Sequence, residues 1–185
     1  MKRVEFYTFE DQVWYRQEDG SQHQLTDKDR DAVRFIIEQF QEFYPEAYEA
    51  CVNEYRRCQA NLPHFQFRIA LRLCKCNFGI IDDSTSDVDS YGNFHFEHVP
   101  CPLRGECKYE NIICHPKFNS KISDAEMRVI ELLFNGVDRP AIAEELCLSP
   151  HTVHNHIRNA CARIGAKKES ELIAYAHRHN LFKEK

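Results

Sequence analysis

Hydrophobic and polar positions divide the first part of the chain into a short β segment and two helices. The first 25 residues alternate apolar and polar positions around two turn-like polar runs, which predicts a small hairpin. Apolar residues then recur at helical spacing from Val33 to Phe40, behind a sequence at 26–29 that resembles a capping box. A second helix is predicted to begin at Pro45.

The pattern is less regular between residues 63 and 99. Residues 63–76 suit a strand or a helix, because their apolar positions alternate while the intervening residues tolerate a helix. Residues 82–92 form a polar loop, and residues 93–99 alternate as a strand. Asp87 and Asp89 resemble the start of a calcium loop, but tyrosine and histidine stand where two later ligands belong, so calcium is not expected.

Helix start and stop signals follow one another closely in the last third of the chain. A capping-box sequence spans 123–126, and Asp138 and Ser149 each precede a first turn that contains proline. Gly136 and Gly165 suit the left-handed end of a helix. These signals predict four short helices, the last of them over residues 169–181.

The third of these helices, predicted over residues 150–164, has one apolar and one polar side. The apolar side, expected to face inward, consists of Val153, Ile157, Ala160 and Ile164. The polar side contains no acidic residue and consists of His151, His154, Asn155, Arg158 and Ala162. Hydrogen-bond donors and one fixed positive charge on an exposed helix suit the major groove of DNA.

Residues 121–185 resemble the LuxR-type, or GerE-like, helix-turn-helix domain along almost their whole length. The features that match are Glu126, the Ile142–Ala143 pair, the run at 149–156 and the stop at Gly165. The resemblance implies a four-helix domain that reads double-stranded DNA with its third helix. It further implies a transcription regulator that forms a homodimer through the fourth helix, residues 169–181.

The resemblance also assigns roles to five positions of this chain. It implies base contacts from His154, Asn155 and Arg158, and phosphate contacts from Ser149 and Thr152. Members of the family usually carry lysine or arginine where this chain has His154, so one fixed positive charge is missing. We therefore expect modest affinity for DNA, supplemented by a homodimer or by a partner such as RNA polymerase or another regulator.

Charge is unevenly distributed along the 185 residues, whose formal net charge is −5. Residues 121–185 hold ten basic and nine acidic residues, which leaves a charge of −6 on residues 1–120. This asymmetry fits an acidic body joined to a small domain that can approach phosphates.

No apolar stretch is long enough to span a membrane, and the N-terminus has no apolar core of a secretory signal, so a cytoplasmic protein is expected. No nucleotide-binding glycine motif or paired nucleophile and base is present, so no enzyme is expected.

Nine cysteines call for an explanation in a chain expected to stay in a reducing compartment. Five of them lie within 41 positions and suggest a metal site of four thiolates, with zinc as the leading cofactor. The predicted ligands are Cys76, Cys101, Cys107 and Cys114, with Cys74 as the alternate first ligand. An iron–sulfur cluster and unligated thiols remain open alternatives.

The other four cysteines lie on apolar helical faces and are expected to be buried as small hydrophobic residues. They are Cys51, Cys58, Cys147 and Cys161.

Together these patterns predict a mostly α protein with a small β component and two domains. An α+β, cysteine-rich N-terminal domain over residues 1–118 precedes a LuxR-type helix-turn-helix domain over residues 121–185. The predicted function is a DNA-binding transcription regulator with a metal-stabilised sensor or interaction module. Two alternatives remain: an adaptor that recruits another regulator or RNA polymerase, and an iron–sulfur redox sensor.

Overall fold

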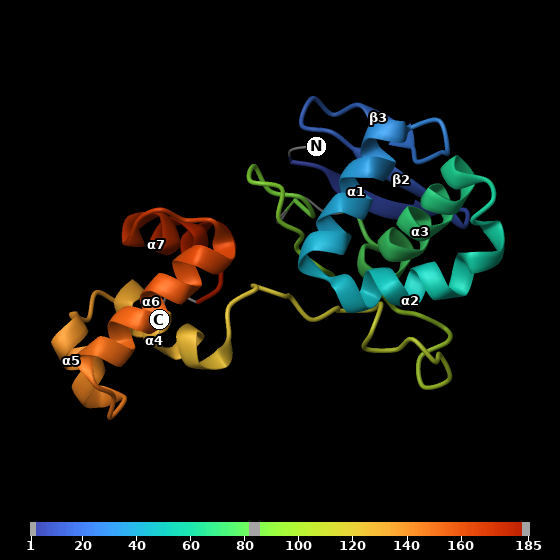
Figure 1. Ribbon diagram of the computed structural model, residues 1–185. Helices are drawn as coiled ribbons and strands as arrows, with labels where there is room; N and C mark the ends of the chain where they lie inside the picture. The colour runs from blue at the N-terminus through green and yellow to red at the C-terminus, as the bar shows by residue number, and fades with distance from the viewer. Residues whose placement is uncertain (1–2, 82–85, 183–185) are drawn as a thin grey trace. The chain divides into compact units, whose positions relative to one another are not determined.

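Two compact units, residues 1–119 and 120–185, make up the chain (Figure 1). The computed structural model describes residues 3–81 and 86–182. Helices predominate and the only named strands of the described ranges are three near the N-terminus, which confirms the predicted fold class. None of the helices in these ranges is both long enough and apolar enough to cross a membrane.

The N-terminal hairpin is confirmed and is extended by a third strand. The antiparallel sheet has the order β1-β2-β3, with strands Glu5–Phe9, Gln12–Arg16 and Gln22–Gln24. Tyr7 pairs with Trp14 in the register of the first two strands. Glu5 and Phe6 at the start of β1 are buried, Phe6 in the hydrophobic core, while Thr8 and Phe9 at its far end are exposed.

Three α-helices and one short 3-10 helix complete the first unit. They are α1 (Arg30–Phe43), α2 (Pro45–Tyr55), η1 (Arg56–Cys58) and α3 (Leu62–Asn77). The helix α3 packs against α1 and α2 and also contacts β1 and β2, so it is the central element of this unit (Figure 1). Its residues Phe65, Ile69 and Leu73, four apart, are all buried. The segment at 63–76 is therefore a helix, and the alternation that also suited a strand is incidental.

The predicted capping box at 26–29 does not form. Asp29 stands at the N-cap of α1 but makes no side-chain cap hydrogen bond. Its carboxylate instead accepts hydrogen bonds from the backbone N–H of Thr26 at 2.8 Å and from the Thr26 hydroxyl at 2.6 Å. The short aspartate thus closes the turn before the helix, and α1 begins three residues later than a box at Thr26 would require.

The strand predicted at 93–99 is wrong. Val88 forms isolated bridges with Val4 and with Phe94, but the described part of the segment from 79 to 123 contains no strand. The alternation has another cause, since the Phe94 and Phe96 rings both insert next to Phe40, with centroid distances of 5.0 and 5.7 Å. An extended segment that buries every second ring has the same period as a strand.

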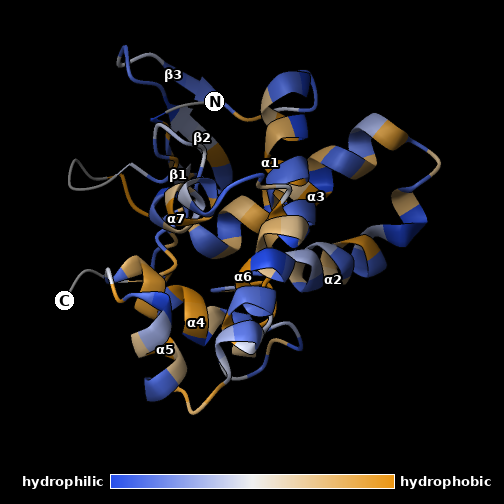
Figure 2. Cartoon of the chain, turned by 60° about the vertical axis from the view of Figure 1, so that its left-hand side comes forward, coloured by the Kyte–Doolittle hydropathy of each residue, from blue (hydrophilic) through white to orange (hydrophobic). Residues whose placement is uncertain are grey.

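The second unit consists of four helices around a separate apolar core. They are α4 (Asp124–Phe134), α5 (Arg139–Glu145), α6 (Pro150–Ile164) and α7 (Glu169–Arg178). Hydrophobic residues predominate on α4, whereas much of α6 is hydrophilic (Figure 2). The four predicted helices are present, and the last ends at Arg178 rather than at residue 181.

Candidate nucleic-acid interface and cysteine cluster

Both ends of α6 are defined by local interactions. Ser149 is the N-cap, and its hydroxyl accepts the backbone N–H of Thr152 at 3.0 Å. Pro150 occupies the first turn, where its missing N–H is not needed. Gly165 ends the helix with φ +74, a left-handed conformation that glycine adopts without strain. The residues at the two ends of α6 therefore determine where the helix begins and where it ends.

The rotation of α6 about its own axis is determined by burial. Val153, Ile157 and Ala160 are buried in the apolar core of the second unit. This core is completed by α4, α5 and α7, all of which contact α6. Because three positions on one side are anchored, the opposite side is held outward.

A buried carboxylate links the end of α6 to the start of α4. Glu126 is only 3% exposed and accepts the backbone N–H of Ser123 at 2.9 Å, while Ser123 caps Glu126 in return. The Nε of Arg163 lies 3.3 Å from the same carboxylate. The predicted capping box is thus present, and Arg163 is engaged within the unit.

The outward side of α6 carries the residues expected to read bases. His154 and Arg158 are exposed, and Asn155 is half-buried beside them. Within the ranges that the structure describes, these three side chains form no hydrogen bond or ion pair. Their donors and acceptors are consequently available to a ligand that covers this side of the helix.

The two predicted phosphate-binding residues lie side by side at the N-terminus of α6. The hydroxyls of Ser149 and Thr152 are 2.8 Å apart. Ser149 is exposed and Thr152 is half-buried. Backbone N–H groups of the first helical turn point in the same direction, which is favourable for an anion.

Comparison with known proteins bears on this second unit. Residues 120–176 match the bacterial regulatory proteins of the luxR family. The chain is 39% identical to spore germination protein GerE of Bacillus subtilis over 59 residues, which is 31% of this chain and 80% of GerE. The chain belongs to the luxR family. Its second unit is therefore a DNA-binding helix-turn-helix domain, in which α5 and α6 form the helix-turn-helix pair.

A second relative shows how far the likeness extends. Fimbriae Z protein of Salmonella typhimurium is 38% identical over 60 residues, which is 32% of this chain and 29% of that relative. The family match begins at residue 120, so residues 1–119 lie outside it. No solved structure matches the chain.

The turn between α5 and α6 corrects one prediction about the cysteines. Cys147 is exposed and has φ +53, because it occupies the turn rather than an apolar helical face. Cys51 is buried as expected, and Cys58 and Cys161 are half-buried.

In the first unit, the predicted metal ligands gather near the C-terminal end of α3. The thiol of Cys76 is within electrostatic reach of the thiols of Cys114 and Cys101. Cys107 lies next to Arg72, whose Nη2 is 3.7 Å from the Cys107 sulfur. Cys74, two residues before Cys76, instead points into the core and is fully buried.

Asn77 holds the strand-free segment that carries Cys114 against α3. Its side-chain N–H groups donate to the carbonyls of Leu73 at 2.9 Å and Ile113 at 2.8 Å. Its side-chain oxygen accepts the backbone N–H of His115 at 2.8 Å. Since Ile113 and His115 flank Cys114, this fully buried amide determines where the Cys114 thiol lies.

Burial favours the protonated form of the Cys76 thiol. Burial raises the pKa of the Cys76 thiol to about 12; nearby Arg72 opposes this rise and the Cys114 thiol adds to it. Burial likewise raises the pKa of Cys51 to about 12. Among the described residues, no three cysteine sulfurs lie within 4.8 Å of one another.

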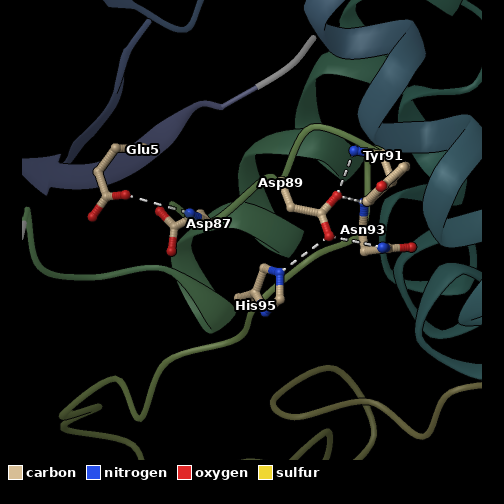
Figure 3. Close-up of polar contacts among 6 residues, drawn as sticks. All are labelled: Glu5, Asp87, Asp89, Tyr91, Asn93 and His95. Atoms are coloured by element: carbon tan, nitrogen blue, oxygen red, sulfur yellow. Dashed lines mark hydrogen bonds and ion pairs between the residues drawn. The ribbon is translucent and has the colours of Figure 1, made fainter. Parts of the chain in front are cut away.

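Three carboxylates elsewhere in the first unit do lie within 4.8 Å of one another. Ligand atoms of Glu5, Asp87 and Glu97 lie within 4.8 Å of one another. Each carboxylate also accepts a backbone hydrogen bond. Asp87 accepts the N–H of Phe6 at 2.6 Å. Glu5 accepts the N–H of Asp87 at 3.3 Å (Figure 3). Glu97 accepts the N–H of Gly79 at 2.8 Å. These bonds join β1, the 86–97 segment and the chain just after α3.

The neighbouring Asp89 organises a tight turn. Its carboxylate accepts the backbone N–H groups of Tyr91 and Asn93 at 2.8 and 2.9 Å, and it also contacts His95 (Figure 3). Burial by itself would raise the pKa of Asp89, but these hydrogen bonds together bring it below its ordinary value. The aspartates of this segment are thus occupied in shaping the chain.

Proposed function

We propose that this chain is a transcription regulator that reads the major groove of double-stranded DNA with α6. The observation that carries the proposal is the outward side of α6, where His154, Asn155 and Arg158 are free of partners within the described ranges and no acidic residue is present. Membership of the luxR family supports the same assignment.

The chemistry of the outward side suggests a role for each residue. Arginine pairs with the O6 and N7 acceptors of guanine, and asparagine pairs with the N6 and N7 groups of adenine. We assign these roles to Arg158 and Asn155, with His154 as a further donor or acceptor. Ser149 and Thr152, with the N–H groups of the first turn, would contact a phosphate and set the position of the helix.

The N-terminal unit supplies the regulatory half of the proposal. Residues 1–120 carry a net charge of −6 and therefore would not approach DNA closely. An acidic surface suits a basic surface of another protein, so we assign this unit to contact with another regulator or RNA polymerase. Pairing of two chains through α7 would place two copies of α6 on adjacent half-sites.

The test uses the full-length chain and a pool of random duplexes. Duplexes enriched by binding would be sequenced, and affinity for the best of them measured by fluorescence anisotropy. We expect Arg158→Ala to lower affinity by roughly tenfold to a hundredfold, which corresponds to about 1–3 kcal/mol, and to relax the preference at one base pair. Arg128→Ala removes the same charge from an exposed position on α4 and should change affinity less than twofold.

Salt dependence provides a second readout. Binding that neutralises a few phosphates should weaken as salt rises, with a logarithmic slope of about −0.9 per phosphate contact. Equal effects of the two arginine substitutions would refute base reading by α6. Enrichment of duplexes only when RNA polymerase is added would favour the adaptor function instead.

A further inference from the structure

The chain between α3 and the second unit is held with little regular structure. Residues 97–118 contain no helix or strand, and Leu103 and Ile112 are exposed. Long segments of this kind are uncommon in compact domains unless something ties them down. Asn77 provides one tie, and the Tyr109 hydroxyl provides another by donating to Glu54 at 2.7 Å.

The three cysteines of this segment lie near the C-terminal end of α3. Asn77 holds both neighbours of Cys114 at this end, Cys114 and Cys101 are within electrostatic reach of Cys76, and Cys107 is next to Arg72 one turn earlier on the helix. Thiols from one helix and one irregular segment thus converge on a small region. This is the arrangement from which tetrahedral sites are commonly built.

We propose that these four thiols bind one zinc ion, with Cys76, Cys101, Cys107 and Cys114 as ligands. The site fastens the irregular segment to α3 and stabilises the first unit, since formation of such a site is coupled to folding. The proposal is independent of DNA reading by α6.

A tetrahedral zinc site fixes the separation of its four thiolates. Four thiolates at about 2.3 Å from zinc lie about 3.8 Å from one another in a tetrahedron. Because no three of the described cysteine sulfurs lie within 4.8 Å of one another, the ligands must move inward to complete the site, and no helix or sheet restrains Cys101, Cys107 and Cys114.

Arg72 supports the site with N–H groups that need acceptors. Its Nη2 lies 3.7 Å from the Cys107 sulfur, while its Nε is buried without a hydrogen-bond partner among the described residues. A neutral thiol accepts hydrogen bonds weakly, whereas a metal-bound thiolate accepts them well. Four thiolates on a divalent ion also carry a net charge of −2, which the guanidinium partly offsets.

The same geometry decides between the two candidate ligands on α3. Residues two apart on a helix point in nearly opposite directions. Cys76 faces the irregular segment, whereas Cys74 is fully buried among the core residues and has Asp87 nearby. Only Cys76 can therefore reach the other three thiols without rotation of α3.

The first experiment measures metal content of the full-length chain purified without chelators. We expect about one zinc per chain. Cys107→Ser should bring the content close to zero, while Cys147→Ser and Cys74→Ala should leave it unchanged. Iron with inorganic sulfide, or a wild-type chain without bound metal that also fails to take up zinc, would overturn the proposal. Loss of zinc from Cys74→Ala with retention in Cys76→Ser would overturn the ligand set.

A second experiment avoids the risk that cysteine variants fail to fold. The number of thiols of the wild-type chain that react under native conditions should rise by four when a chelator removes zinc. Arg72→Gln should weaken zinc affinity by roughly 10- to 100-fold, because it removes hydrogen bonds to the thiolates. Arg68→Gln is the matched control, since Arg68 lies one turn earlier and packs over the Tyr55 ring at 4.8 Å. Equal zinc affinity of these two variants would refute the role of Arg72.

Discussion

Replacing Ser149 separates two properties of α6, its stability and its approach to phosphate. The Ser149 hydroxyl caps the helix by accepting the N–H of Thr152 at 3.0 Å. Ser149→Ala removes this acceptor. Ser149→Asp keeps an acceptor at the N-cap, because aspartate caps helices as well as serine does, but it adds a negative charge. Ser149→Ala should therefore lower the stability of α6, whereas Ser149→Asp should keep its stability and weaken DNA binding.

The expected magnitudes follow from the geometry of the cap. Loss of the cap in Ser149→Ala should cost about 1 kcal/mol of unfolding free energy in the second unit. The carboxylate of Ser149→Asp should instead stabilise the helix by about 0.3–1 kcal/mol through the helix dipole. Beside a phosphate at about 4 Å, the same carboxylate is repelled by about 1 kcal/mol even in bulk water, or roughly fivefold in affinity.

Hydrogen exchange of the α6 amides reports the stability of this unit within the full chain. Protection should fall about fivefold in Ser149→Ala and hold or rise in Ser149→Asp, while anisotropy should show DNA affinity at least fivefold weaker in Ser149→Asp. Arg128→Ala lowers the net charge by the same one unit at an exposed position on α4 and should change DNA affinity less than twofold. Unchanged affinity of Ser149→Asp for DNA would show that the start of α6 does not face a phosphate.

Two further predictions concern the first unit. Asn77→Ala leaves the Ile113 carbonyl and the His115 N–H without partners. It should therefore lower the unfolding free energy, measured by denaturant titration, by about 2–5 kcal/mol. A change below about 1 kcal/mol would contradict the role of Asn77. The pKa of Asp89 is lower in the folded chain than the ordinary aspartate value of 3.8. The Asp89 carboxylate therefore stabilises the fold at pH values above 3.8, and this stabilisation is lost as the pH falls below 3.8. Asp89→Asn should therefore reduce the loss of stability at acid pH, and an unaltered pH profile would refute this account.

The second unit could be predicted closely from the sequence because its signals are local. Ser123, Asp138 and Ser149 each cap the helix that follows them, and Gly165 ends α6 as expected. Each signal acts within four residues, so it needs no knowledge of distant contacts. The link between Glu126 and Arg163 was missed because it joins residues 37 positions apart.

The first unit was less predictable because its structure depends on contacts between distant residues. Phe94 and Phe96 alternate like strand residues but pack on Phe40, more than fifty positions away. Asn77 was not singled out from the sequence. A lone amide four residues after Leu73, on a buried helical face, is nevertheless a pattern that indicates a buried hydrogen-bonding residue. A buried amide in such a place must find partners, and here they come from a segment with no pattern of its own.

This contrast explains why the two units need different kinds of support. The second unit joins short, well-capped helices around one apolar core, so each helix contributes to its own stability. In the first unit, residues 97–118 form no helix or strand and contribute few buried apolar side chains, so their order must come from specific cross-links. Asn77 and Tyr109 supply two such links through neutral or singly charged hydrogen bonds. A metal bound by Cys101, Cys107 and Cys114 would join this segment to α3 at three further points, and its removal should loosen the first unit while the helix-turn-helix unit stays folded.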